Sequence, residues 1–194
     1  MTKLSGFNKI KTSVFISGRG SNLENLFKFS LKKKSLIKIV LVVSNNSKAK
    51  GLIFAKKKNI KNKVFSFIDK KKAENKVLKE LKKEKVELIC LAGFMKILSK
   101  NFIKKFKGKI LNIHPSLLPK YKGLNTHLRA IKNKDKYSGC TVHLVNSRLD
   151  SGKIILQKKI KIKKKDTPKS LNKRILKEEH ILYPKAIKKI FSNL

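Results

Sequence analysis

The sequence has no tryptophan, only two cysteines and only 11 acidic residues among its 194 positions. Cys90 and Cys140 are too few for a disulfide framework, and Cys90 lies in an apolar run typical of a buried strand. No apolar run approaches the roughly 18 residues that a membrane-spanning helix requires, and the amino terminus lacks a signal-peptide core and cleavage site. We therefore expect a cytoplasmic protein in a reducing environment, with no membrane partner.

The scarcity of acidic residues leaves a formal net charge of +40, because Lys and Arg together number 51. Such a charge is typical of proteins that bind nucleic acid. Only four of these cations are arginine, however, and the lysines are spread over every expected element rather than gathered in one stripe. We interpret them as a solvated coat with no dedicated nucleic-acid partner, which can still steer anionic small molecules toward the protein.

Apolar residues alternate between strand-like and helix-like spacing along the chain. The length suits one hydrophobic core, so we expect residues 1–194 to form a single domain. Strands that alternate with helices predict an α/β fold, in which a mostly parallel central sheet has helices on both faces. The expected strands are 12–17, 36–44, 63–67, 86–93, 109–114, 140–146 and 153–162, and the expected helices are 22–33, 48–59, 70–85, 94–106, 126–133 and 167–191, the last broken at Pro184.

A glycine loop follows the first expected strand. Gly18 and Gly20 permit positive φ and close backbone approach, and Ser21 or Asn22 can cap the next helix. Free N–H groups at such a helix start form an anion site, to which Arg19 adds charge. The loop is neither a Walker A motif nor G-x-G-x-x-G, so it indicates neither a nucleoside triphosphate nor NAD. A tight turn without a ligand is the alternative.

Asn112 and His114 end the fifth expected strand and point to the same face, because they are two residues apart. A lone histidine in this place is usually structural, but Asp150 lies in a turn farther along and can hold an imidazole protonated. Asn112 can then donate to a developing oxyanion. An amide, an imidazole and a carboxylate suit direct acyl-type transfer at a carbonyl.

Other chemistries have weaker support in the sequence. There is no G-x-S-x-G elbow and no activated-cysteine signature, so a covalent intermediate is not expected. The four histidines lack H-E-x-x-H spacing, so we predict no metal. We expect His127 and His143 to support the pocket and assign neither a chemical role.

Five segments carry a resemblance to a known family: FISGRGSNLENLF, ELICLAGFMKILSKNF, LNIHPSLLPKYKGLNTH, GCTVHLVNSRLDSGKIILQKKI and EEHILYP. They occur in the order found in phosphoribosylglycinamide formyltransferases, and from Ser13 to Phe191 the chain resembles these folate-dependent enzymes of purine synthesis. The resemblance implies a Rossmann-like formyltransferase fold, and we expect a monomer or homodimer. It also implies transfer of a formyl group from the co-substrate 10-formyltetrahydrofolate to the amine of glycinamide ribonucleotide, by direct attack through a tetrahedral intermediate.

The same resemblance implies roles for individual residues. The catalytic residues would be Asn112, His114 and Asp150, with Asp150 raising the pKa of the histidine. The ribonucleotide would be held by Gly20, Ser21, Asn22, Leu23, Glu24 and Glu179, and the folate by Lys71, Met95, Lys96, Ile97, Leu98 and Asn112. Glu179 also falls on the apolar stripe of the last helix, although a place at the rim of that stripe is the alternative. The chain departs from the family pattern at Arg19, Lys122, Asn125 and Ser151.

Three alternatives remain open. A formyltetrahydrofolate hydrolase would use water as the acceptor and usually has an additional amino-terminal domain. A transfer-RNA formyltransferase would fit the charge but needs a further nucleic-acid-binding domain. A basic RNA-binding protein predicts aromatic side chains interleaved with cations for base stacking, whereas the phenylalanines here lie mostly in apolar runs.

Overall fold

The computed structural model describes residues 9–191, which contain one seven-stranded sheet. The order across the sheet is β3-β2-β1-β4-β5-β6-β7. The strands are β1 Ile10–Ile16, β2 Ile37–Ser44, β3 Asn62–Val64, β4 Leu88–Leu91, β5 Lys109–His114, β6 Tyr137–Leu144 and β7 Ile154–Lys161. The first five are parallel, whereas β6 is antiparallel to β5 and β7 to β6. The predicted mostly parallel α/β fold is confirmed.

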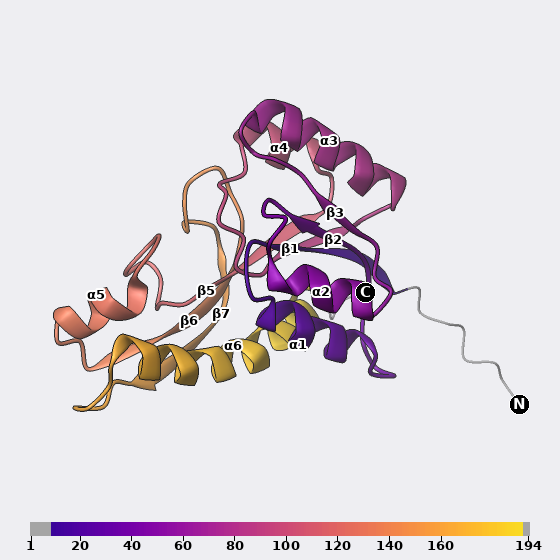
Figure 1. The fold of residues 1–194 in the computed structure, drawn as a ribbon. Coiled ribbons are helices and arrows are strands. Elements are labelled where there is room, and N and C mark those ends of the chain that lie inside the picture. The colour runs from indigo at the N-terminus through magenta and orange to yellow at the C-terminus, as the bar shows by residue number, and fades with distance from the viewer. Residues whose placement is uncertain (1–8, 192–194) are drawn as a thin grey trace, which may run out of the picture.

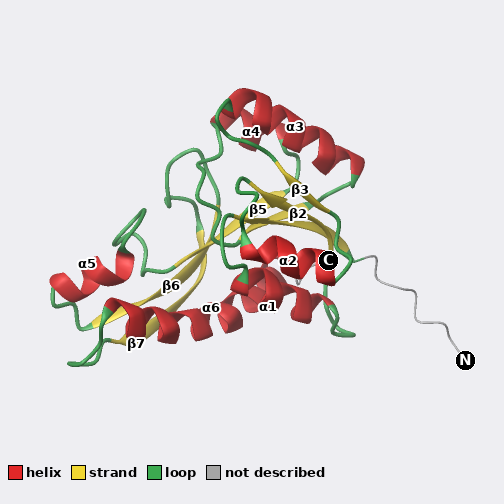
Figure 2. Ribbon diagram, in the orientation of Figure 1, coloured by secondary structure: helices red, strands yellow, loops and turns green. Residues whose placement is uncertain are grey.

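Helices cover both faces of this sheet, as Figures 1 and 2 show. One face packs against α1 Ser21–Ser30, α2 Lys50–Lys57 and α6 Pro168–Phe191, with α5 Thr126–Lys132 beside α6; the other packs against α3 Lys70–Lys83 and α4 Lys100–Lys105. Strand alternation divides the core accordingly, since Val14 and Ile16 join the first cluster and Phe15 joins the second. Among the described residues, no helix has the length and apolar content needed to cross a bilayer.

Two expected elements are wrong in ways that matter for the site. Residues 94–99 are not helical. Helix α4 begins only at Lys100, and Ser99 caps it by accepting a hydrogen bond from the Phe102 N–H. The last helix is not broken at Pro184 but continues through it. Proline has no N–H for the carbonyl four residues earlier, and Asn25 of α1 supplies the missing donor to the His180 oxygen at 2.6 Å.

The parallel strands place several loops at one edge of the sheet. β1, β4 and β5 are neighbours, so the segments that follow their carboxyl ends lie together. Ligands of open α/β sheets bind at this edge. The glycine loop, residues 93–99 and the loop after His114 all begin there.

Candidate active site

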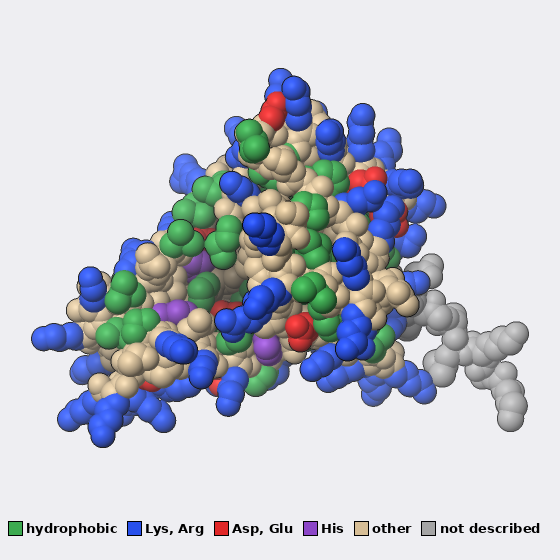
Figure 3. Space-filling model, viewed as in Figure 1, with side chains coloured by type: hydrophobic (Ala, Val, Ile, Leu, Met, Phe, Trp, Pro, Cys, Tyr) green, Lys and Arg blue, Asp and Glu red, His purple; other side chains and the backbone are tan. Residues whose placement is uncertain are grey.

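A cavity of about 600 Å³ opens at this edge of the sheet. Its walls come from residues 93–98, from the ends of β5 and β6, from the loops at 123–127 and 145–150, and from α1 and α6. Figure 3 shows histidine surfaces in a hollow on this side of the molecule, surrounded by Lys and Arg side chains. A cavity of this size is large enough for a small-molecule substrate.

Four polar side chains meet in the wall of the cavity: Asn112 and His114 of β5, His143 of β6, and Asp150 of the following loop. One carboxylate oxygen of Asp150 lies 3.4 Å from His114 Nδ1, and the other lies 3.4 Å from Asn112 Nδ2 and 3.7 Å from His143 Nε2. The antiparallel register sets Asn112 opposite His143, with Nδ2 and Nε2 3.1 Å apart. The three predicted catalytic residues therefore share one cavity, and their chemical roles stay predictions.

Backbone carbonyls determine which ring nitrogens carry hydrogen. His114 Nε2 lies 2.8 Å from the Tyr121 oxygen and His143 Nδ1 lies 2.8 Å from the Leu144 oxygen. Because a carbonyl only accepts, both of these nitrogens donate. His143 Nε2 faces both the Asn112 amide and the Asp150 carboxylate. His114 Nδ1, which faces the carboxylate, is left as the nitrogen that can gain or lose a proton.

Burial controls the charge of this cluster. It lowers the pKa of His114, and it outweighs the Tyr121 carbonyl and the Asp150 carboxylate, which both raise that pKa. Asp150 therefore acts on the His114 pKa in the expected direction, but the net shift of that pKa is downward. For Asp150, burial raises the pKa, yet the contacts with His143 and His114 and the 2.8 Å hydrogen bond from the Gly123 N–H outweigh it, so the net shift is downward.

A second polar pair lies in the cavity between α1 and α6. Asn22 Nδ2 donates to Glu179 Oε2 at 2.7 Å, and the Asn22 Oδ1 is buried without a hydrogen-bond partner. Burial raises the pKa of Glu179 to about 7, although the Asn22 hydrogen bond lowers it. Glu179 is 7% exposed, so the predicted inward position is confirmed and the rim alternative is wrong.

The glycine loop positions the start of α1. The cap residue is Gly20 at φ 85°, with no side-chain hydrogen bond, so the predicted capping by Ser21 or Asn22 is wrong. A Cβ on Gly20 would lie 2.6 Å from the Cα of Gly51, so the close approach of α2 requires glycine here.

The cavity contains only part of the predicted binding residues. Its lining includes Asn22, Met95, Lys96, Ile97, Leu98, Asn112 and Glu179. Lys71 is exposed near the start of α3 and does not line it, and neither do Gly20 and Ser21. The Leu23 side chain is fully buried in the core, and the Glu24 N–H already donates to the Gly20 oxygen at 2.9 Å. Neither group is therefore open to a ligand as it stands.

The expected supporting position of His143 is confirmed, because it lines the cavity and contacts both Asn112 and Asp150. Sequence reasoning missed two backbone groups: the Tyr121 carbonyl, which orients His114, and the Gly123 N–H, which binds Asp150. Strand alternation in CTVHLV indicates that His143 faces away from Val142, but only the β5–β6 register places it at Asn112. Backbone groups leave no signal in the side-chain pattern. Within residues 9–191, no group of three or more potential ligand side chains is arranged to hold a metal ion.

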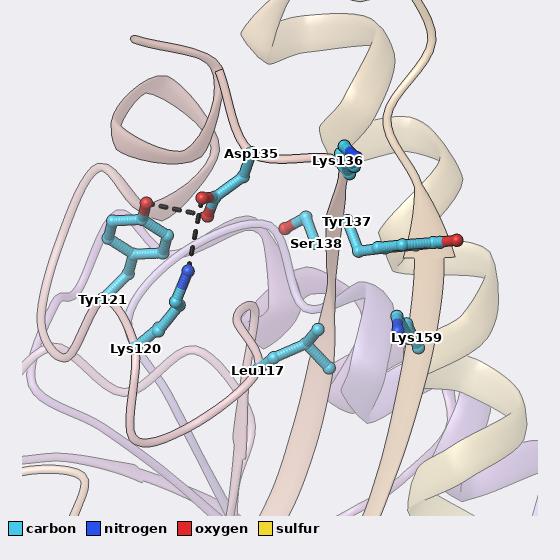
Figure 4. Close-up of a pocket in the computed structure, with 8 residues that line it drawn as sticks. All are labelled: Leu117, Lys120, Tyr121, Asp135, Lys136, Tyr137, Ser138 and Lys159. Carbon is cyan, nitrogen blue, oxygen red and sulfur yellow. Dashed lines mark hydrogen bonds and ion pairs between the residues drawn. The ribbon is translucent and has the colours of Figure 1, made fainter. Parts of the chain in front are cut away.

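A smaller cavity of about 310 Å³ is lined by residues of the loop after β5 and by the start of β6 (Figure 4). Tyr121 Oη donates to Asp135 at 2.8 Å, and Lys120 pairs with the same carboxylate at 3.3 Å. These contacts hold the outer part of the loop whose Tyr121 carbonyl orients His114. We assign this cavity a structural part only.

Comparison with known proteins adds a consistent set of relatives. A family model described as formyl transferase matches residues 10–187. A phosphoribosylglycinamide formyltransferase of Haemophilus influenzae is 42% identical, over 92% of this chain and 85% of that protein. The trifunctional purine biosynthetic protein adenosine-3 of Gallus gallus is 43% identical over 95% of this chain, which spans only 19% of that longer protein. The crystal structure of the Brucella melitensis phosphoribosylglycinamide formyltransferase superimposes with a TM-score of 0.89 at 42% identity, covering 94% of this chain and 96% of that one.

Proposed function

The chain belongs to the formyl transferase family, and we propose that it transfers the formyl group of 10-formyltetrahydrofolate to the amine of glycinamide ribonucleotide. The observation that carries the proposal is the single cavity that contains Asn112, His114, Asp150 and Glu179 together with residues 95–98. Relatives of similar length have this activity in their names.

The proposed binding mode divides the cavity between two substrates. Residues 95–98 present the exposed side chains of Met95 and Ile97, which can pack against the ring faces of a folate. Asn22 and Glu179 lie on the α1–α6 side, where hydroxyl groups of a ribose can bind, and the start of α1 beside Gly20 suits the phosphate. Lys71 has no place in this binding mode.

The proposed reaction begins with attack of the amine nitrogen on the formyl carbon, so that negative charge develops on the formyl oxygen. An N–H of Asn112 can donate to this oxygen by exchanging its long 3.4 Å contact with Asp150. The anion also raises the pKa of the neutral His114, so that its Nδ1 takes up the proton that the attacking nitrogen loses, and the resulting imidazolium stabilises the charge of the tetrahedral intermediate. The bond between the formyl carbon and N10 of the folate then breaks.

Proton transfer completes the proposed reaction. The attacking nitrogen loses one proton and N10 gains one, so the overall step needs no oxidant and no metal ion. Asp150, whose pKa is lowered, supplies the carboxylate that stabilises the imidazolium form of His114 at 3.4 Å. His114 and Asp150 together can pass the proton from the attacking nitrogen to N10 of the folate.

The test is to incubate the protein with 10-formyltetrahydrofolate, with and without glycinamide ribonucleotide, and to follow release of tetrahydrofolate. The proposal expects release that depends on the ribonucleotide. Equal release in both reactions would assign the protein to hydrolysis instead, and no release in either would reject the proposal.

We propose a cytoplasmic location, in keeping with two buried free cysteines. We also propose a monomer or homodimer, and size-exclusion chromatography with light scattering measures the oligomeric state.

A further inference from the structure

Residues 93–99 form an irregular segment between β4 and α4. Its two ends point into the core, because the Phe94 ring packs edge-on against the Phe15 ring at 5.3 Å and Leu98 is only 4% exposed. The middle points outward into the cavity, where Met95 is 62% and Ile97 is 54% exposed. A segment that exposes apolar side chains to a ligand without helical hydrogen bonds needs other contacts to hold its shape.

Polar contacts hold this segment at both ends. At the β4 end, the Ser17 N–H donates to the Gly93 oxygen at 3.1 Å, and Ser17 Oγ accepts from the Met95 N–H at 2.8 Å. At the α4 end, Glu74 of α3 accepts from both the N–H of Ser99, at 2.7 Å, and its hydroxyl group. Between these contacts lie the residues that line the cavity.

Glu74 is only 4% exposed, which is costly for a carboxylate. Ser99 already caps α4 with its own oxygen, accepting from the Phe102 N–H at 3.0 Å, so a six-residue helix does not need a carboxylate as a second cap. What Glu74 adds is a fixed direction for the chain at Ser99, one residue after Leu98.

We propose that Glu74 is a positioning residue for the formyl donor. Through Ser99 it fixes the far end of residues 93–99, so that Met95 and Ile97 face the folate. The inference rests on the proposed function, in which this segment binds the donor and not the ribonucleotide. A purely structural link between α3 and α4 would instead lower stability without separating the two substrates.

The test compares Glu74→Ala and Glu74→Gln with Glu80→Ala, a control that removes a carboxylate from the same helix where it pairs with Lys61 at 3.2 Å. Glu74→Ala is expected to raise KM for 10-formyltetrahydrofolate about tenfold and to leave KM for the ribonucleotide within about twofold, because a buried hydrogen-bonded pair is lost at one substrate only. Glu74→Gln keeps one acceptor and restores part of the loss. The control changes neither constant.

Hydrogen exchange gives a readout that does not need turnover. Amides of residues 95–99 should exchange at least about fivefold faster in Glu74→Ala and unchanged in Glu80→Ala. If Glu74→Ala does not fold, Glu74→Gln takes its place in the test. It should show the same changes in hydrogen exchange and in KM for the folate, at a smaller size. Unchanged exchange, or equal changes in both KM values, overturns the inference. Failure of the wild type to use either substrate rejects the proposed function alone, because the exchange result still stands.

Discussion

His114 lies where its surroundings act on its charge in opposite directions. Burial lowers its pKa, whereas Asp150 raises it, so the two effects oppose one another in the same side chain. A substrate oxyanion would add to the effect of Asp150. In the proposed reaction, this balance lets one imidazole enter neutral and leave the first step protonated.

Asp150→Asn tests this balance. Loss of the carboxylate removes a group that raises the pKa of His114, so that pKa falls further. We expect a lower kcat and an acidic limb of the pH profile that moves to lower pH. The measurement is kcat from pH 5 to pH 8 for Asp150→Asn and for the wild type, with the same substrates. Any titration of the substrates then affects both pH profiles equally. An acidic limb at the same pH would show that the two groups are not coupled.

Glu179 links pH to stability. Burial raises its pKa from an ordinary value of 4.5 to about 7, so its contribution to stability is complete below pH 4.5 and is lost as pH rises through about 7. The shift corresponds to on the order of 3 kcal/mol. Glu179→Gln keeps an acceptor for Asn22 and should be more stable than the wild type at pH 8 but not at pH 4.5. Urea unfolding at both pH values measures this, and a mutational difference independent of pH would contradict the assigned pKa.

At the scale of the element, the strands were easier to predict than the connections. Runs such as LIKIVLVVS indicate buried parallel strands by themselves, and the structure has β2 there. Residues 94–99 have an apolar pattern that also fits a helix, whereas in the structure the helix begins only after Ser99, which caps it and is held by the distant Glu74. Likewise, nothing near Pro184 in the sequence indicates that Asn25 supplies its missing hydrogen bond.

Asn25 and Pro184 should therefore be coupled. Asn25→Ala leaves the His180 carbonyl without its donor and should lower the free energy of unfolding by about 1–2 kcal/mol. In a Pro184→Ala background, the new N–H of Ala can donate to that carbonyl, so the same Asn25 change should cost less. Urea unfolding of the four proteins gives the coupling energy. Additive effects would mean that Asn25 does not compensate for the proline.

At the scale of the whole molecule, the fold and the position of the site follow from features that a sequence carries. Alternating strands and helices predict the parallel sheet, and its carboxyl edge predicts where Asn112 and His114 lie in one cavity with Asn22 of α1. The contact between Asn112 and His143 depends instead on the register of β5 and β6. Lys71 was assigned by motif match alone, and the structure leaves it outside the cavity.

The net charge of +40 should make stability depend on salt. Like charges on the lysine coat repel one another in the folded protein, and salt screens them within about 10 Å at 0.1 M. We expect Tm to rise by several degrees between 20 mM and 500 mM sodium chloride, and calorimetry measures it. A constant or falling Tm would contradict net repulsion on the surface.

The most direct test of the central claim is single-turnover formyl transfer by His114→Ala, with His127→Ala as a control in a histidine that also lines the cavity. Because the proposed reaction uses the imidazole of His114 to stabilise the developing oxyanion, the account predicts a loss of about 100-fold or more in the rate of transfer by a protein that still folds. The control should keep most of the rate. Transfer by His114→Ala at nearly the wild-type rate would contradict the account.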